Sequence, residues 1–183
     1  MSSRYSANLV TLGGGCFWCL EAFYSRVHGV SLVTSGYSGG YIKHPTAEQV
    51  YRGNTGHAEV IQFVFDSKVI SYRKLLEIFY VMHDPTTLNA QGNDVGEEYR
   101  SIIFYHSNSQ KTVAEDVTKN FAAVQYENPV VTQIVPFQKF WPAEEYNQNF
   151  YDRNPNTGYC QAIITPKLAK LRREFAKLLV SNS

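Results

Sequence analysis

The chain has 183 residues, 44% of them hydrophobic, and its 17 basic and 16 acidic side chains leave a formal net charge of +1 at pH 7. This length suits one domain, residues 1–183, with a sizeable buried core. The balanced charge gives no electrostatic reason to expect nucleic acid or an anionic membrane as a partner, and no apolar run is long enough to span a bilayer.

The first part of the chain alternates predicted strands with one helix. In chain order these are a buried strand at 8–12, a glycine turn at 13–15, a helix through 21–27, and strands at 30–38 and 58–65. A loop rich in glycine, proline and histidine joins the last two strands. Because glycine permits tight turns and close backbone approach, the three glycines are expected to lead the first strand directly into the helix.

The middle of the chain predicts a helix with clear boundaries. Ser71 can cap its N-terminus, apolar residues then recur at helical spacing, and the helix should end before Pro85. A polar, glycine-rich loop is expected at 88–100. The segment RSIIFY, residues 100–105, predicts a strand.

The last third of the chain again mixes helices with a strand. The expected elements are a helix to about residue 124, a strand at 130–135, a helix from Pro142 to about Tyr151 and a last helix from Thr165. Ser107 and Gln110 have the spacing of a capping box for the first helix, and Pro142 suits the first turn of the second. We predict an α+β fold, a single compact two-layer domain with a mixed sheet and flanking helices.

Cys16 follows the three glycines at the predicted start of a helix. Backbone N–H groups and the positive end of the helix dipole converge there, which should lower the pKa of the thiol and favour the nucleophilic thiolate. The glycines would also let a substrate approach the sulfur. A small buried side chain is the alternative, but the glycine turn favours a nucleophile.

The other two cysteines, Cys19 and Cys160, leave several interpretations open. Cys16 and Cys19 have the C-x-x-C spacing of a redox dithiol or of half a zinc site, but zinc needs about four ligands and no second pair exists, so we expect no metal. Cys160 could form a disulfide with an oxidised Cys16 or be an incidental exposed thiol. An odd, low number of cysteines favours a reducing compartment, so we expect a cytoplasmic protein, with an organelle also open.

Two polar segments could supply further chemistry. Glu59 lies at a loop-to-strand boundary in TGHAE, where a desolvated carboxyl group would have a raised pKa and could act as an acid; an ordinary ion-paired glutamate is the alternative. Asp94 and Tyr99 lie in the glycine-rich segment QGNDVGEEYR, which could equally be a solvated connection.

Five segments, in this order, resemble the motifs of the A class of peptide methionine sulfoxide reductases: GGGCFWCLE, YSGG, NTGHAEV, HDPTTLNAQGNDVGEEYRS and NPNTGYC. The resemblance runs from about Val10 to about Phe175. It implies a ferredoxin-like, or α-β plait, core. It also implies an enzyme without a cofactor that reduces methionine-S-sulfoxide, free or in proteins, repairs oxidised proteins, and is recycled by thioredoxin.

The resemblance also implies the roles of the catalytic residues. Cys16 would be the nucleophile and would become a sulfenic acid. Glu59 would protonate the sulfoxide oxygen, and Asp94 and Tyr99 would help to hold that oxygen and a water molecule. Cys160 would be the resolving cysteine, which condenses with the sulfenic acid to a disulfide.

The substrate-binding residues follow the family pattern with one departure. Phe17 and Trp18 would form the apolar wall for the S-methyl group. The family usually carries a tyrosine where this chain has Ala47. Tyr51 lies four residues later and on a helical turn would share a face with Ala47, so Tyr51, or a water molecule, should fill that space. Cys19 is glycine in some members, which makes it a possible second thiol.

Two other functions would explain part of the sequence. One is a thioredoxin-like dithiol oxidoreductase that uses Cys16 and Cys19, and the other is a module whose tyrosine-rich surface grips a peptide. The first does not explain Glu59 or Cys160, and in the second the cysteines would be incidental. The expected partners are methionine sulfoxide in oxidised proteins and peptides, and thioredoxin as the reductant. We expect no nucleic-acid partner, no membrane partner and a monomer.

Overall fold

The computed structural model describes residues 8–181, and a six-stranded sheet forms its centre. The strands, in the order in which they lie across the sheet, are β7 (Gln133–Pro136), β6 (Ile102–Tyr105), β1 (Leu9–Gly13), β3 (Ala58–Phe65), β2 (Val30–Ser38) and β8 (Phe140–Pro142). All neighbours are antiparallel except β6 and β7, which run parallel. The sheet is therefore mixed, as predicted.

Helices and one small hairpin surround this sheet. The α-helices are α2 (Phe17–Tyr24), α3 (Ala47–Tyr51), α4 (Tyr72–Met82), α5 (Asn108–Val117), α6 (Phe150–Arg153) and α7 (Thr165–Phe175). The hairpin consists of β4 (Ala90–Gln91) and β5 (Asp94–Val95). Short 3₁₀ or π turns are η1 (Glu97–Tyr99), η2 (Thr118–Ala122), η3 (Glu145–Asn147), η4 (Cys160–Ile164) and η5 (Ala176–Leu178).

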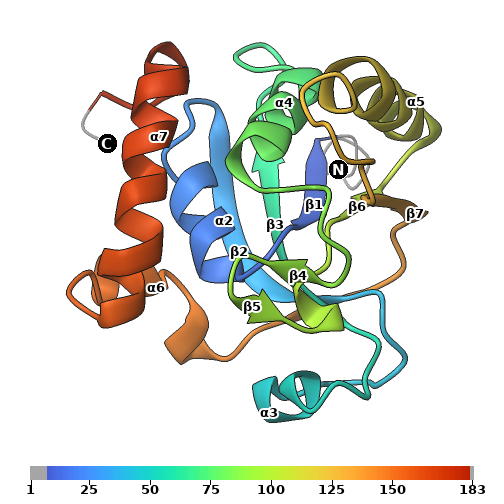
Figure 1. The fold of residues 1–183 in the computed structure, drawn as a ribbon, viewed down its shortest axis with the longest axis vertical. Coiled ribbons are helices and arrows are strands. Elements are labelled where there is room, and N and C mark those ends of the chain that lie inside the picture. The colour runs from blue at the N-terminus through green and yellow to red at the C-terminus, as the bar shows by residue number, and fades with distance from the viewer. Residues whose placement is uncertain (1–7, 182–183) are drawn as a thin grey trace, which may run out of the picture.

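The order of the central elements is that of a ferredoxin-like fold. The chain runs β1-α2-β2-β3-α4-β6, and the corresponding strands lie side by side as β6-β1-β3-β2. Helices α2 and α4 lie in front of this sheet in Figure 1, with α7 beside α2 and α5 beside α4. The predicted α+β class and plait core are confirmed, with β7 and β8 added at the two edges.

Local sequence signals explain where two of the helices begin. The Ser71 hydroxyl accepts from the backbone N–H of Lys74 at 3.1 Å, which caps α4 as predicted. The Ser107 hydroxyl likewise accepts from the N–H of Gln110 at 3.1 Å at the start of α5. Only half of the predicted capping box forms, because the Gln110 side chain accepts from the N–H of His106 instead of Ser107.

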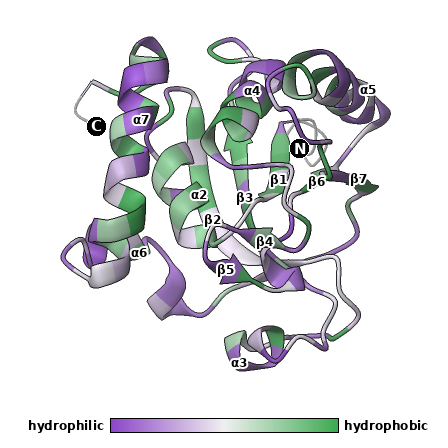
Figure 2. Cartoon of the chain, viewed as in Figure 1, coloured by the Kyte–Doolittle hydropathy of each residue, from purple (hydrophilic) through white to green (hydrophobic). Residues whose placement is uncertain are grey.

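Helix α2 is buried on nearly every side, and Figure 2 shows it as mostly hydrophobic, whereas α7 carries both hydrophilic and hydrophobic residues. Tyr24 stacks on Phe63 of β3 at a centroid distance of 4.8 Å, and its hydroxyl donates to the carbonyl of Leu75 in α4 at 2.8 Å. Phe23 is 1% exposed. Truncating it to alanine should cost about 3–5 kcal/mol, since a cavity would remain beneath the helix.

The predicted helix from Pro142 to about Tyr151 is wrong. Residues 140–142 instead form β8, in which Pro142 pairs with Gly36 at the end of β2. Proline is tolerated there because β8 is an edge strand and an outward-facing N–H is not needed. The chain then turns twice, through η3 and α6, and the Gln148 side chain accepts from the N–H of Ser35 and donates to its carbonyl.

Two short elements lie in segments that the sequence predicts as loops. Helix α3 begins with a capping box: the Thr46 hydroxyl accepts from the N–H of Gln49, and the Gln49 side chain accepts from the N–H of Thr46. The β4–β5 hairpin lies within the predicted loop 88–100. Both elements are too short to produce a hydrophobic period.

The prediction of one domain covers residues 1–183, of which 1–7 and 182–183 lie outside the described residues. The described elements share one sheet and its helices, and the full extent of the domain stays a prediction. Among residues 8–181, no helix is both long enough and apolar enough to cross a membrane.

Candidate active site

The glycine turn places Cys16 where the sequence predicts it. A Cβ atom on Gly13 would lie 2.8 Å from the carbonyl oxygen of Glu59, so only glycine allows β1 to approach β3 this closely. Gly15 has a φ of +91°, which is unfavourable for other residues. Cys16 follows as the N-cap of α2 and is 9% exposed.

Glu59 is an acidic side chain that contacts the start of the helix after this turn. It is 1% exposed, and its Oε2 accepts from the backbone N–H of Phe17 at 2.9 Å. Burial raises the pKa of Glu59 to about 8, although the Phe17 N–H and the Tyr51 hydroxyl lower it. The charges of Glu98 and Asp94 act in the same direction as burial. Glu59 is therefore mostly protonated at neutral pH.

The pKa of Cys16 differs from the sequence expectation. Burial raises the pKa of this thiol well above its ordinary value, and the neighbouring Cys19 and Glu59 act in the same direction. The helix N-terminus offsets little of this increase in pKa. The Phe17 N–H is already bonded to Glu59, and the Cys19 N–H donates to the Cys16 carbonyl at 3.1 Å. Only the Trp18 N–H lowers the Cys16 pKa. The predicted lowering is thus wrong for this resting state.

Cys19 lies next to Cys16 and is the more acidic of the two thiols. Its interaction with Cys16 lowers its pKa most, burial opposes this, and Lys167 and the Tyr159 hydroxyl lower it further. The Tyr159 hydroxyl lies 3.8 Å from the Cys19 sulfur and donates to Asp94 Oδ2 at 2.8 Å. Tyr159 thereby connects the second thiol to the predicted site residue Asp94.

Two tyrosines border the Cys16–Glu59 pair. Helix α3 carries the buried Ala47 at its first position and Tyr51 at its last, so the expected helical turn between them is present. Burial raises the pKa values of Tyr51 and Tyr99, and the charges of Glu59 and Cys16 contribute to both shifts. Tyr51 remains 47% exposed, so it reaches from solvent to the buried carboxyl group.

The two predicted wall residues have different surroundings. Phe17 is completely buried and packs against Tyr37 at a centroid distance of 5.7 Å. Trp18 is partly exposed, stacks on Phe150 at 3.6 Å, and donates from Nε1 to Asn147 Oδ1 at 3.1 Å. Of the two predicted wall residues, only Trp18 is therefore partly accessible to a ligand.

Cys160 lies inside the protein and not in an exposed loop. It is 0% exposed and begins η4, directly after Tyr159. Cys16, Cys19 and Cys160 are all free thiols. The alternative of an incidental exposed thiol is therefore wrong. Because Tyr159 contacts Cys19, the segment that carries Cys160 lies against the same helix as Cys16.

Residues 8–179 match the family model described as peptide methionine sulfoxide reductase. The chain belongs to this family. The reductase is 52% identical to peptide methionine sulfoxide reductase MsrA of Polynucleobacter asymbioticus over 170 residues, which cover 92% of this chain and 90% of the relative. The predicted family and enzyme class, an oxidoreductase, are confirmed, and the two alternative functions lose their support.

Solved structures of one relative extend the comparison. The reductase resembles Mxr1 of Saccharomyces cerevisiae in reduced form with a TM-score of 0.77 and 34% identity, covering 84% of this chain and 90% of that one. Mxr1 has also been solved in complex with Trx2, which this chain matches with a TM-score of 0.54 and 26% identity, covering 81% and 90%.

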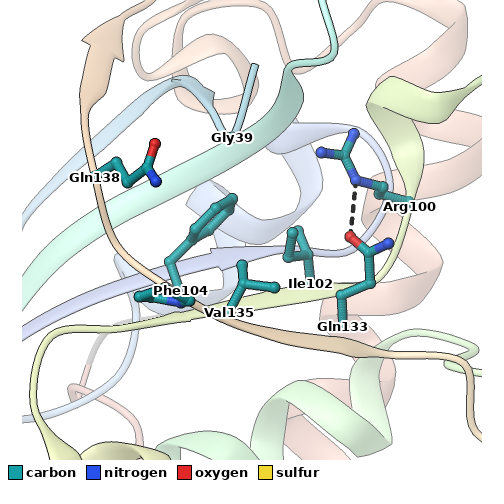
Figure 3. Close-up of a pocket in the computed structure, with 8 residues that line it drawn as sticks. Gly39, Arg100, Ile102, Phe104, Gln133, Val135 and Gln138 are labelled. Atoms are coloured by element: carbon teal, nitrogen blue, oxygen red, sulfur yellow. Dashed lines mark hydrogen bonds between the residues drawn. The ribbon is translucent and has the colours of Figure 1, made fainter. Parts of the chain in front are cut away.

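Figure 3 shows a pocket on the face of the central sheet opposite to the one that α2 and α4 cover. Its cavity of about 210 Å³ is lined by Gly39, Arg100, Ile102, Phe104, Gln133, Val135, Pro136 and Gln138. Ile102 and Phe104 belong to a small apolar cluster that is separate from the core containing Cys16. None of the predicted site residues of the reductase lines this pocket, so it is not the candidate active site.

Sequence reasoning missed two polar residues of the reductase site. Tyr159 directly precedes Cys160 in NPNTGYC, and that position was the available signal. Glu98 is 5% exposed and acts on Glu59, but one more acidic residue in a polar loop gave no signal. Among residues 8–181, no group of three or more His, Cys, Asp or Glu side chains is arranged to hold a metal ion.

Proposed function

We propose that this methionine sulfoxide reductase acts on methionine-S-sulfoxide, free or in polypeptides, with Cys16 as nucleophile and Glu59 as acid. One observation carries the proposal. A buried glutamate with a pKa of about 8 is hydrogen-bonded to the residue that follows the cysteine. A side chain that is mostly protonated at neutral pH is the group that sulfoxide chemistry needs beside a thiol.

Glu59 as an acid would overcome the main chemical obstacle to sulfoxide reduction, which is the loss of the oxygen. The sulfoxide sulfur is electrophilic, but oxide is a very poor leaving group. A proton from Glu59 to the sulfoxide oxygen makes the sulfur more electrophilic and turns the oxygen into hydroxyl. General acid catalysis of this kind contributes about 10²–10⁴-fold to a rate.

The pKa values of Cys16 and Glu59 favour a reaction that starts with both groups in their neutral, protonated forms. Cys16 begins as a thiol, because burial raises its pKa, and Glu59 begins as a carboxylic acid. As Glu59 gives its proton to the oxygen, its carboxylate can take the thiol proton from Cys16. The Cys16 sulfur forms a bond to the electrophilic sulfoxide sulfur. The hydroxyl then passes from that sulfur to the Cys16 sulfur as the new S–S bond breaks, which gives methionine and a Cys16 sulfenic acid without net loss of a proton.

Substrate binding would use the side chains around this pair. The partly exposed ring of Trp18 would receive the S-methyl group, and movement of Phe17 would complete the wall. The hydroxyls of Tyr51 and Tyr99, both close to Glu59, could donate to the sulfoxide oxygen. Asp94 would hold a water molecule at the same end of the site.

Recycling would use a second thiol. The sulfenic acid condenses with the Cys160 thiol to a Cys16–Cys160 disulfide and water, and an external dithiol reduces that disulfide. The complex of the relative Mxr1 with Trx2 supports thioredoxin as the reductant. We also propose that the reductase is a single-domain, monomeric, cytoplasmic enzyme that repairs oxidised proteins.

The decisive experiment is reduction of the separated S and R epimers of a methionine sulfoxide peptide with dithiothreitol. Wild type should reduce only the S epimer, and Cys16→Ser should reduce neither. Reduction of the S epimer by Cys16→Ser would overturn the assignment of the nucleophile. Reduction of the R epimer by wild type would overturn the stereochemistry.

A further inference from the structure

Glu21 is a buried carboxyl group that the proposed reaction does not use. It lies in α2, one turn after Phe17, and is 3% exposed. Its Oε1 accepts from the backbone N–H of Asn149 at 2.9 Å, and its Oε2 accepts from the N–H of Phe150 at 3.3 Å. Both carboxyl oxygens are thus used to hold one distant segment of backbone.

That segment has an unusual conformation at the point of contact. Asn149 has φ +51° and ψ +38°, in the left-handed region that non-glycine residues seldom adopt. The turn at Asn149 separates η3 from α6. Strained backbone persists where its surroundings hold it in place, and here the bonds to Glu21 supply that restraint.

The held segment carries two partners of the Trp18 indole, and a third, Tyr159, meets the ring edge-on at a centroid distance of 5.7 Å. Phe150 stacks on the indole at a centroid distance of 3.6 Å, with only 4° between the two planes. Asn147, three residues earlier, accepts the indole N–H at 3.1 Å. Phe150 thereby fixes the plane of the ring, and Asn147 fixes its rotation within that plane.

We propose that Glu21 is a positioning residue for substrate binding, which acts through Asn149 and Phe150 to hold Trp18. The inference rests on the proposed role of Trp18 as the surface that receives the S-methyl group. A carboxylate is suited to this role because two backbone donors need two acceptor oxygens. Glutamine has only one, so it would leave one donor facing an amide NH₂.

A second contact between the same elements provides a matched control. Arg26, two residues after the end of α2, pairs with Asp152 of α6 at 2.5 Å. This pair fastens the same segment, but Asp152 is 43% exposed and lies beyond Phe150. Breaking the pair should loosen α6 at its outer end, while the bonds between Glu21 and the segment continue to hold Trp18.

The test uses Trp18 as its own reporter. Trp18 and Trp141 are the only tryptophans, so Trp141→Phe leaves one emitting ring. In that background, Glu21→Gln should shift the Trp18 emission to longer wavelength. It should also raise KM for the S-sulfoxide peptide about tenfold, with kcat within about threefold, because ground-state and transition-state binding are lost together. Asp152→Asn should leave emission and KM unchanged.

Three outcomes would overturn the inference: unchanged emission in Glu21→Gln, unchanged KM, or an equal effect of Asp152→Asn. If Glu21→Gln does not fold, Phe150→Leu gives the second test. It keeps the bonds to Glu21 but removes the stacked ring, so it should shift emission and raise KM in the same way. Because emission needs no turnover, failure of the proposed reaction in wild type would be distinguished from failure of the positioning role.

Discussion

The backbone N–H of Phe17 donates to Oε2 of Glu59 at 2.9 Å, which ties the first residue of α2 to β3. Because Phe17 follows Cys16, this bond fixes the position of the acid relative to the sulfur. It also occupies the first N–H group of the helix, which is then not available to the thiol. This hydrogen bond therefore holds the Glu59 carboxyl group in place. It also removes part of the electrostatic stabilisation that a helix N-terminus would give to a thiolate at Cys16.

Glu59→Gln should separate the geometry of this contact from the proton. A glutamine oxygen can still accept from the Phe17 N–H, but the amide cannot protonate a sulfoxide. We expect kcat/KM for the S-sulfoxide to fall by about 10²–10⁴-fold while the fold is kept. Circular dichroism verifies the fold, and the exposed Glu115→Gln serves as the control. Activity within threefold of wild type would exclude Glu59 as the acid.

Tyr51→Phe should change both the rate and its pH dependence. The Tyr51 hydroxyl lowers the pKa of Glu59, so its removal should move the loss of activity at alkaline pH from about 8 to a higher value. The rate below that pH should fall about tenfold, since one donor to the sulfoxide oxygen is lost. A pH profile of kcat/KM for both enzymes measures the two effects.

For this variant the contrary result is equally clear. Unchanged turnover and an unchanged alkaline limit in Tyr51→Phe would mean that a water molecule, and not Tyr51, occupies the space beside Ala47. Tyr41→Phe is the matched control, because Tyr41 is 71% exposed and does not act on Glu59.

Glu59 should also make the reductase less stable as pH rises. Its folded pKa of about 8 lies above the ordinary 4.5, so between these values the folded protein binds more protons than the unfolded chain. The free energy of unfolding should therefore fall through this window, by at most about 1.4 kcal/mol per pH unit. Urea unfolding at pH 5, 6.5 and 8 measures the slope.

In that experiment Glu59→Gln is the comparison, since it lacks the titrating group. The difference between wild type and Glu59→Gln should change steadily from pH 5 to pH 8 in favour of the variant. A constant difference would show that Glu59 has an ordinary pKa in the folded protein.

The resolving thiol can be identified by the disulfide that forms after one turnover without reductant. We expect a Cys16–Cys160 bridge in wild type. Cys160→Ser should complete one turnover but lose most thioredoxin-dependent cycling, whereas Cys19→Ser should keep it. Peptide mapping of the oxidised protein decides the matter. A Cys16–Cys19 bridge as the main product would transfer the resolving role to Cys19.

Local sequence signals predicted much of the fold. The strands at 30–38 and 58–65 have the expected bounds, and the Ser71 cap starts its helix at the expected residue. A cap or a hydrophobic run is a property of neighbouring residues, so it can be recognised without the rest of the chain. The structure around Pro142 could not be recognised in this way, because β8 exists only through its pairing with the last residues of β2.

The sequence by itself determined which residues could do chemistry: a cysteine after three glycines, a glutamate at the start of a strand, and motifs in the family order. Only the tertiary structure decided their ionisation. Burial raises the pKa values of Cys16 and Glu59, against the lowering expected for a thiol at a helix start. The physical reason is that the cost of desolvating a charge depends on everything packed around it. Most of those groups, such as Tyr51 and Glu98, come from distant parts of the chain.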